Sequence, residues 1–156
     1  MEDIKRILAV SWITQYCKET VHAAVALAST YGAELSVIHV VDTSWMKGWN
    51  LPIKLNEEEH QKNIERTKAD LNTVINREKK EGMKVKIIIK EGDPVAEILK
   101  VIEKEKIDLC VLRAHEESRM EHFMVGGSND EIIRKMPCSI LLVKCEHLKK
   151  GGRVKD

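Results

Sequence analysis

The segment from Arg113 to Ser128 contains residue types that can hold an anionic ligand. Gly126, Gly127 and Ser128 stand at the start of a helix-period stretch. The free backbone N–H groups of a helix start and the positive end of its dipole favour phosphate, and glycine permits close approach. Arg113 adds a positive charge, whereas the carboxylate of Glu116 would repel a phosphate chain. The segment therefore predicts anion binding with nearly balanced local charge.

Further candidate contacts follow other apolar runs. Trp12 and Thr14 come shortly after the first run, and Trp12 would either stack on a base or plug the pocket. Val41 ends the second run, and His115 follows the fourth. We include these four residues in the candidate ligand site.

Two tryptophans occupy a long connection between residues 42 and 55. Trp45 and Trp49 could form a lid over the sheet edge, a surface for a protein partner, or a small core within the loop itself. The sequence leaves these three alternatives open.

The sequence lacks the residue patterns of a zinc site and of the common catalytic motifs. His115 and His122 are separated by six residues and form no standard zinc-ligand spacing, even with Cys138 and Cys145 nearby in the sequence. The chain has no Gly-x-Ser-x-Gly elbow, no P-loop and no His-Glu-x-x-His motif. We therefore expect neither a metal site nor catalysis.

The elements that must position these residues alternate along the chain. Short apolar runs are separated by helix-period segments, which is typical of βαβ units and a parallel sheet. Helix starts are indicated by Asn56 with Glu59, by Asp93 with Pro94, and by Ser128 with Glu131. The expected strands are residues 7–10, 35–41, 85–89, 109–112 and 139–143, so that Arg113 opens the irregular stretch after the fourth strand.

This alternation predicts a three-layer α/β/α fold with an open, parallel, five-stranded sheet of Rossmann-like type. Ligands of such sheets bind beyond the carboxyl ends of the strands, where the strand order reverses. Trp12, Thr14, Arg113 and the glycine pair all follow strand ends, so the fold is expected to gather them at one edge.

Length and charge narrow the function further. The 156 residues predict one domain over residues 1–146 and a flexible tail over residues 147–156. The net charge of +1 lacks the basic excess of a nucleic-acid binder. No apolar stretch reaches the roughly 18 residues of a membrane span, and the first residues are charged, so we expect a cytoplasmic protein with no membrane contact. The four cysteines form no Cys-x-x-Cys pair and are expected to be free thiols.

Five separate segments follow one another along the chain: Arg6–Val10, Gly32–Val41, Glu91–Ile98, Ile107–Leu112 and Met136–Val143. By their order and separation they resemble the universal stress protein family, over roughly Lys5 to Lys144. The resemblance implies an adenine nucleotide alpha hydrolase-like fold with strand order 3-2-1-4-5, and a homodimer often formed through the last strand. In one branch of the family it also implies ATP or AMP bound beside strands one and four.

The chain departs from the nucleotide-binding branch at several positions. That branch carries Gly-x2-Gly-x9-Gly-Ser/Thr after the fourth strand, and here Arg113 and Glu116 replace the first two glycines. Gly126 and Gly127 take the places of the third glycine and of the hydroxyl residue, with Ser128 one residue later. Trp12 stands where the resemblance implies an aspartate on the adenine side, while Thr14 keeps the family's hydroxyl.

Two functions are compatible with these residues. The first is a dimeric binding or regulatory protein of stress adaptation, with a degenerate nucleotide site and a protein partner at the Trp45 and Trp49 loop. The second is a genuine ATP or AMP binding module that uses Arg113 and the helix start at Gly126, Gly127 and Ser128.

Overall fold

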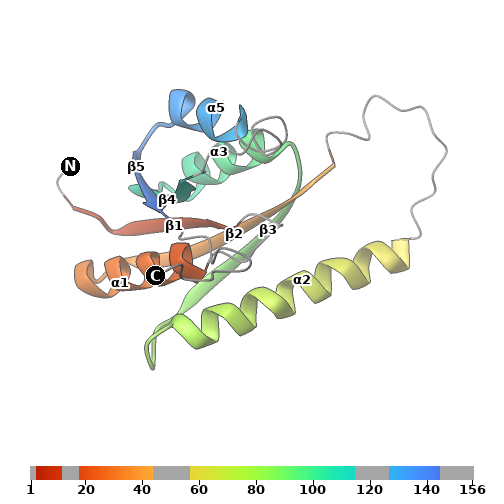
Figure 1. Cartoon of the computed structure of the whole chain (residues 1–156), viewed down its shortest axis with the longest axis horizontal. Helices are drawn as coiled ribbons and strands as arrows, with labels where there is room; N and C mark the ends of the chain where they lie inside the picture. The colour runs from red at the N-terminus through yellow and green to blue at the C-terminus, as the bar shows by residue number, and fades with distance from the viewer. Residues whose placement is uncertain (1–2, 12–17, 44–56, 115–126, 145–156) are drawn as a thin grey trace, which may run out of the picture.

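The computed structural model describes residues 3–11, 18–43, 57–114 and 127–144, and the following account concerns these residues (Figure 1). For residues 127–129 it describes the backbone only. The strands are β1 (Arg6–Ser11), β2 (Glu34–Asp42), β3 (Val85–Gly92), β4 (Leu109–Ala114) and β5 (Ser139–Lys144). The helices are α1 (Lys18–Tyr31), α2 (Glu57–Glu78), α3 (Pro94–Lys104) and α5 (Gly127–Lys135).

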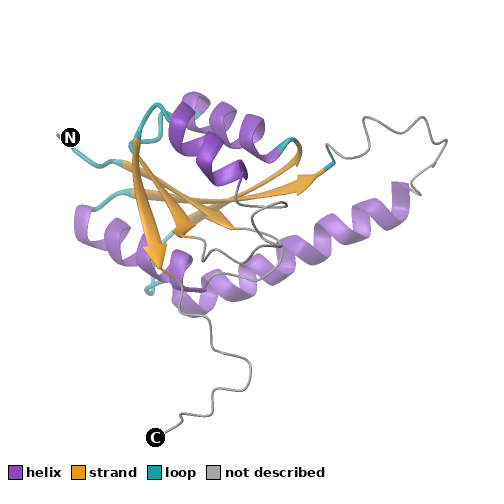
Figure 2. Cartoon of the chain, turned by 45° about the horizontal axis from the view of Figure 1, so that its top comes forward, coloured by secondary structure: helices purple, strands orange, loops and turns teal. Residues whose placement is uncertain are grey.

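The sheet is parallel throughout and has the order β3-β2-β1-β4-β5. Helices α3 and α5 cover one face, and α1 and α2 cover the other (Figure 2). The predicted three-layer fold and strand order are thus confirmed. The order reverses between β1 and β4, so the ligand crevice of this sheet type is expected at their carboxyl ends.

Two apolar cores flank the sheet, because successive strand residues point to opposite faces. On the α1/α2 face, Ile7, Ala9 and Val37 pack with α1 residues such as Val21 and Val25. On the α3/α5 face, Leu8, Val10, Ile38 and Val40 pack with the stripe of α3 and with Ile132 of α5. The apolar runs of β1, β2 and β4 were continuous in the sequence because these strands are buried on both faces.

Arg113 differs from its predicted position. It lies inside β4 rather than at the start of a loop, and it pairs with Val143 of β5. The apolar pattern ends at Leu112, but a parallel neighbour supplies backbone hydrogen-bond partners for two more residues whatever their polarity. Arg113 is therefore held on the sheet itself.

Helix α3 has well-defined signals at both ends. Asp93 accepts a hydrogen bond from the backbone N–H of Ala96 at 3.0 Å, and Pro94 occupies the first turn. At the other end the N–H of Ile107 donates to the Ile102 carbonyl at 3.0 Å, and that of Lys106 donates to the Glu103 carbonyl at 3.4 Å. This is a Schellman motif, and it places Lys106 in the left-handed region with φ of 51°.

Replacing Lys106 with glycine is expected to raise the free energy of unfolding by about 0.5–1 kcal/mol, because glycine adopts positive φ without a Cβ clash. Urea denaturation followed by circular dichroism would measure the change. The matched control is Glu103→Gly, an exposed position inside the same last turn, where glycine should lower stability by a similar amount. Destabilisation by both variants would contradict the prediction.

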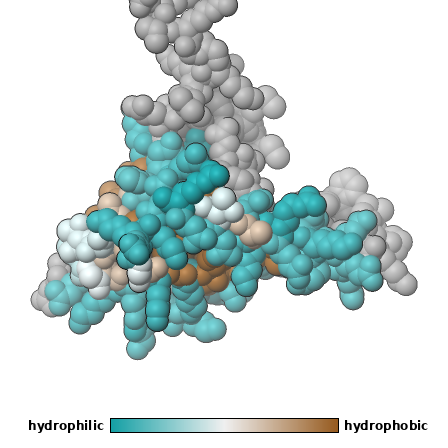
Figure 3. All heavy atoms as spheres, turned by 90° about the horizontal axis from the view of Figure 1, so that it is seen from below, coloured by the Kyte–Doolittle hydropathy of each residue, from teal (hydrophilic) through white to brown (hydrophobic). Residues whose placement is uncertain are grey.

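The first half of α2 projects beyond the sheet (Figure 1), and its surface is hydrophilic when seen from below (Figure 3). Leu71 and Ile75 anchor the second half in the core. Two histidine–glutamate contacts connect α2 to neighbouring elements. His60 Nε2 of α2 lies 2.5 Å from Glu91 Oε1 of β3, and His22 Nδ1 of α1 lies 2.8 Å from Glu78 Oε2 of α2. Among the described helices, none is long and apolar enough to cross a bilayer.

Candidate functional site

Polar side chains gather at the carboxyl ends of the three strands nearest the order reversal. Ser11 ends β1 opposite His39 of β2, and Arg113 lies near the end of β4. By strand alternation, Ser11 shares a face with Ala9, His39 with Val37, and Arg113 with Val111, and all of these apolar residues belong to the α1/α2 core. The sheet therefore carries a hydroxyl, an imidazole and a guanidinium on one face of its carboxyl edge, which is the edge where sheets of this type bind ligands.

His39 is the most deeply placed of these groups. Its side chain is 3% exposed, and its Nδ1 is buried without a hydrogen-bond partner. Burial lowers the pKa of His39 below 6.5, while a hydrogen bond to the Ser11 backbone partly opposes this shift. Its register neighbours on the adjoining strands, Ser11 and Ile89, carry no charge. The imidazole is therefore neutral near pH 7.

The stability of the protein is expected to fall as the pH drops below 6.5. The unfolded chain binds a proton at His39 in this range, whereas the folded chain resists it because its pKa is lowered. Stabilisation by the neutral form is therefore complete above pH 6.5 and is lost as the pH falls through the folded-state pKa, by at most about 1.4 kcal/mol per pH unit.

Urea unfolding at pH 7.5 and 5.5 would measure this difference for wild type and for His39→Leu, which lacks the titrating group. The Ser36→Ala variant changes a buried residue of the same strand that does not titrate, and it should keep the wild-type pH dependence. An unchanged pH dependence in His39→Leu would refute the assignment.

The serine and cysteine side chains that the structure describes near this edge or in the cores lack an activating base. His39 forms its hydrogen bond with the Ser11 backbone and not with the Ser11 hydroxyl. Because Nδ1 of His39 has no hydrogen-bond partner, the imidazole does not polarise that hydroxyl. Burial raises the pKa of both Cys110 and Cys138, which keeps these free thiols protonated. Within the described ranges, no three His, Cys, Asp or Glu side chains meet as metal ligands would.

The structure places some of the predicted site residues and leaves others outside its described part. Val41 is half-buried near the end of β2, two residues after His39 and on the same face. Gly127 and Ser128 lie in the first turn of α5, so the helix begins at Gly127, one residue earlier than Ser128 predicts. Outside the described residues lie Trp12, Thr14, Trp45, Trp49, His115, Glu116 and Gly126.

Sequence analysis missed Ser11 and His39 as site residues. The signal was present, because His39 interrupts an apolar strand on the same face as Val41, and Ser11 ends the strand beside it. A polar residue inside a buried strand needs a partner, and an expected ligand edge is where that partner can come from outside the chain.

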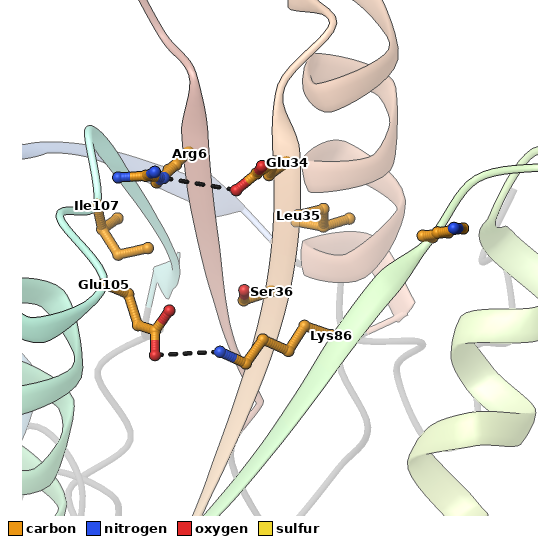
Figure 4. Close-up of a pocket in the computed structure, with 8 residues that line it drawn as sticks. Arg6, Glu34, Leu35, Ser36, Lys86, Glu105 and Ile107 are labelled. Atoms are coloured by element: carbon orange, nitrogen blue, oxygen red, sulfur yellow. Dashed lines mark ion pairs between the residues drawn. The ribbon is translucent and has the colours of Figure 1, made fainter.

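A hollow lies at the amino edge of the sheet, opposite the carboxyl edge, with a volume of about 330 Å³ (Figure 4). Its charges already neutralise one another in part: Arg6 Nε lies 3.4 Å from Glu34 Oε2, and Lys86 Nζ lies 3.1 Å from Glu105 Oε1. These groups are largely solvent-exposed, and such pairs contribute little energy. Among the described residues that line this hollow, no side-chain polar atom is both buried and without a hydrogen-bond partner, unlike Nδ1 of His39 at the carboxyl edge.

Comparisons with known proteins agree with the fold of the chain. The family model described as "Universal stress protein family" matches residues 4–144. A universal stress protein of Methanocaldococcus jannaschii is 29% identical over 132 residues, which cover 81% of this chain and 74% of that protein.

Two solved structures share the fold. A universal stress protein in complex with cAMP superimposes with a TM-score of 0.65 at 14% identity, covering 93% of this chain and 100% of that chain. The universal stress protein from Archaeoglobus fulgidus in complex with dAMP gives 0.61 at 15% identity, covering 92% and 100%.

Proposed function

Because this chain belongs to the universal stress protein family, we propose that it is a non-catalytic binding protein with an altered nucleotide site. The site takes an adenine nucleotide with a single phosphate, of the AMP class, in preference to ATP. The observation that carries this proposal is the placement of Arg113 on β4 beside the order reversal, on the same sheet face as Ser11 and His39.

The charges favour a ligand with few phosphates. On that face of β1, β2 and β4, the carboxyl-end residues that the structure describes are Ser11, His39, Val41 and Arg113, with one permanent cation among them. One guanidinium matches one phosphate well, since its N–H groups can donate two parallel hydrogen bonds. A polyphosphate needs more positive charge than one guanidinium supplies. Three residues after Arg113 the sequence has the carboxylate of Glu116, where the nucleotide-binding branch of the family has a glycine.

The known ligands of similar proteins support the same class. The relatives solved with cAMP and dAMP each hold an adenine nucleotide that carries one phosphate group. The start of α5 at Gly127 offers the backbone N–H groups of a helix N-terminus as a second contact for that phosphate.

Isothermal titration calorimetry with adenosine, AMP, ADP and ATP tests the proposal. We expect AMP to bind more tightly than adenosine, and ATP to bind no more tightly than AMP. ATP binding at least tenfold tighter than AMP would restore the alternative of an ordinary ATP module. Absence of binding by every adenine compound would refute the nucleotide function.

We further propose a homodimer formed through β5. This strand is at the edge of the sheet, and Leu141 and Leu142 are 36% and 47% exposed on its two faces. An edge strand with exposed apolar side chains invites pairing with another strand, and a second copy presents the same surface. Ile133 of α5 adds a third exposed apolar side chain.

A further inference from the structure

The unmatched Nδ1 of His39 is a buried polar atom that calls for a physical explanation. The His39 side chain is 3% exposed, and Nδ1 has no hydrogen-bond partner in the structure. Buried polar groups in native proteins are nearly all satisfied by protein, water or ligand. A burial this complete, at the edge where α/β sheets bind ligands, suggests that the missing partner comes with the ligand.

The hydrogen-bonding state of the ring follows from its contacts. The bond to the Ser11 backbone favours the protonated ring, so the imidazole donates and the backbone oxygen accepts. Because Nδ1 has no hydrogen-bond partner, we assign the donated proton to Nε2. Burial lowers the pKa of the ring, so the second nitrogen carries no proton at neutral pH. Nδ1 is therefore a hydrogen-bond acceptor.

We propose that Nδ1 of His39 accepts a hydrogen bond from a neutral N–H or O–H group of the nucleoside part of the ligand, and so makes the site selective for the nucleoside. This inference rests on the nucleotide function proposed above. A phosphate would not serve, because at neutral pH it offers acceptors and would require a protonated ring. His39 is thus assigned to the uncharged end of the ligand and Arg113 to its phosphate.

The position of His39 limits which groups can reach it. It lies two residues before Val41 on the same face, which is roughly 7 Å deeper along the strand. Half-buried Val41 lies between His39 and the carboxyl end of the strand, which favours a small donor group. The 6-amino edge of adenine and a ribose hydroxyl are both narrow, neutral donors.

The test measures how well the protein distinguishes ligands that keep or lack each donor. Calorimetry would compare AMP with IMP, in which a carbonyl replaces the 6-amino group, and with 2′-deoxy-AMP and 3′-deoxy-AMP. We expect wild type to bind AMP about tenfold or more tightly than IMP if the base supplies the donor. If the ribose supplies it, the same preference appears against one deoxynucleotide.

Two substitutions at His39 give the decisive comparison. His39→Leu removes the acceptor and should reduce the preference to within about twofold, whereas His39→Asn keeps a short-chain acceptor and should retain part of it. Ser36→Ala, a buried change on the same strand but on the α3/α5 face, should leave the preference unchanged. Thermal unfolding of each variant checks that it is folded.

Each other outcome overturns the inference in a recognisable way. If His39→Leu keeps both the wild-type affinities and the wild-type preference, Nδ1 meets only water and does not contact the ligand. If the affinities for AMP and its analogues fall equally in His39→Leu, the residue has a structural role. If the wild-type protein binds none of the nucleotides, the proposed nucleotide function is refuted as well. This outcome is measured on the wild-type protein and does not depend on any His39 variant.

Discussion

Leu142→Asp is expected to dissociate the proposed β5 dimer into monomers at micromolar concentration. Leu142 lies on β5 at the sheet edge with 47% of its surface exposed. In a two-fold symmetric interface the same leucine is buried twice, and the loss of both corresponds to about 3 kcal/mol. The two buried carboxylates would also cost desolvation free energy. We therefore expect the dissociation constant to rise by about 100-fold or more.

Sedimentation velocity over a range of protein concentrations measures this change. Tyr31→Asp is the matched control, because Tyr31 is an exposed apolar residue at 54% but ends α1 instead of lying on β5. That variant should remain dimeric. A wild-type protein that stays monomeric at about 100 µM, or a Leu142→Asp variant that associates like wild type, would contradict an interface at β5.

The sequence was sufficient to predict the architecture because burial leaves a periodic pattern. In α1, for example, Val21, Ala24, Val25 and Ala28 recur at helical spacing and are all buried, and the glycine that follows the helix, Gly32, adopts a φ of 63°. The strand order came from the resemblance to a family, since periodicity carries no information on which strands are neighbours. Both expectations are confirmed by the sheet.

The site was harder to predict, because its determinants depend on neighbours that are distant in sequence. Arg113 belongs to β4 because β5 pairs with it, and β5 lies 30 residues later along the chain. The face of His39 follows from strand alternation, but the absence of a partner at Nδ1 follows only from the three-dimensional packing. The ion pair between His60 and Glu91 spans 31 residues and left no local signal.

Arg113→Ala is expected to weaken AMP binding by about 10- to 100-fold. A hydrogen-bonded pair between a guanidinium and a phosphate contributes roughly 1.5–3 kcal/mol, and the other carboxyl-end side chains described on this face supply no replacement cation. Arg113→Lys keeps the positive charge but loses the bidentate hydrogen bonding of the guanidinium, so it should give an intermediate affinity for AMP. Calorimetry at low ionic strength measures all three proteins.

Adenosine provides the internal control for this variant. It lacks the phosphate, so its affinity should be the same for wild type and Arg113→Ala if the guanidinium acts on the phosphate. An equal loss for adenosine and AMP would mean that the substitution disturbs the strand, since Arg113 is half-buried and pairs with Val143. The difference between the two ligands therefore separates the charge of Arg113 from its packing. Only a loss confined to AMP assigns the phosphate to β4 and leaves the nucleoside for His39.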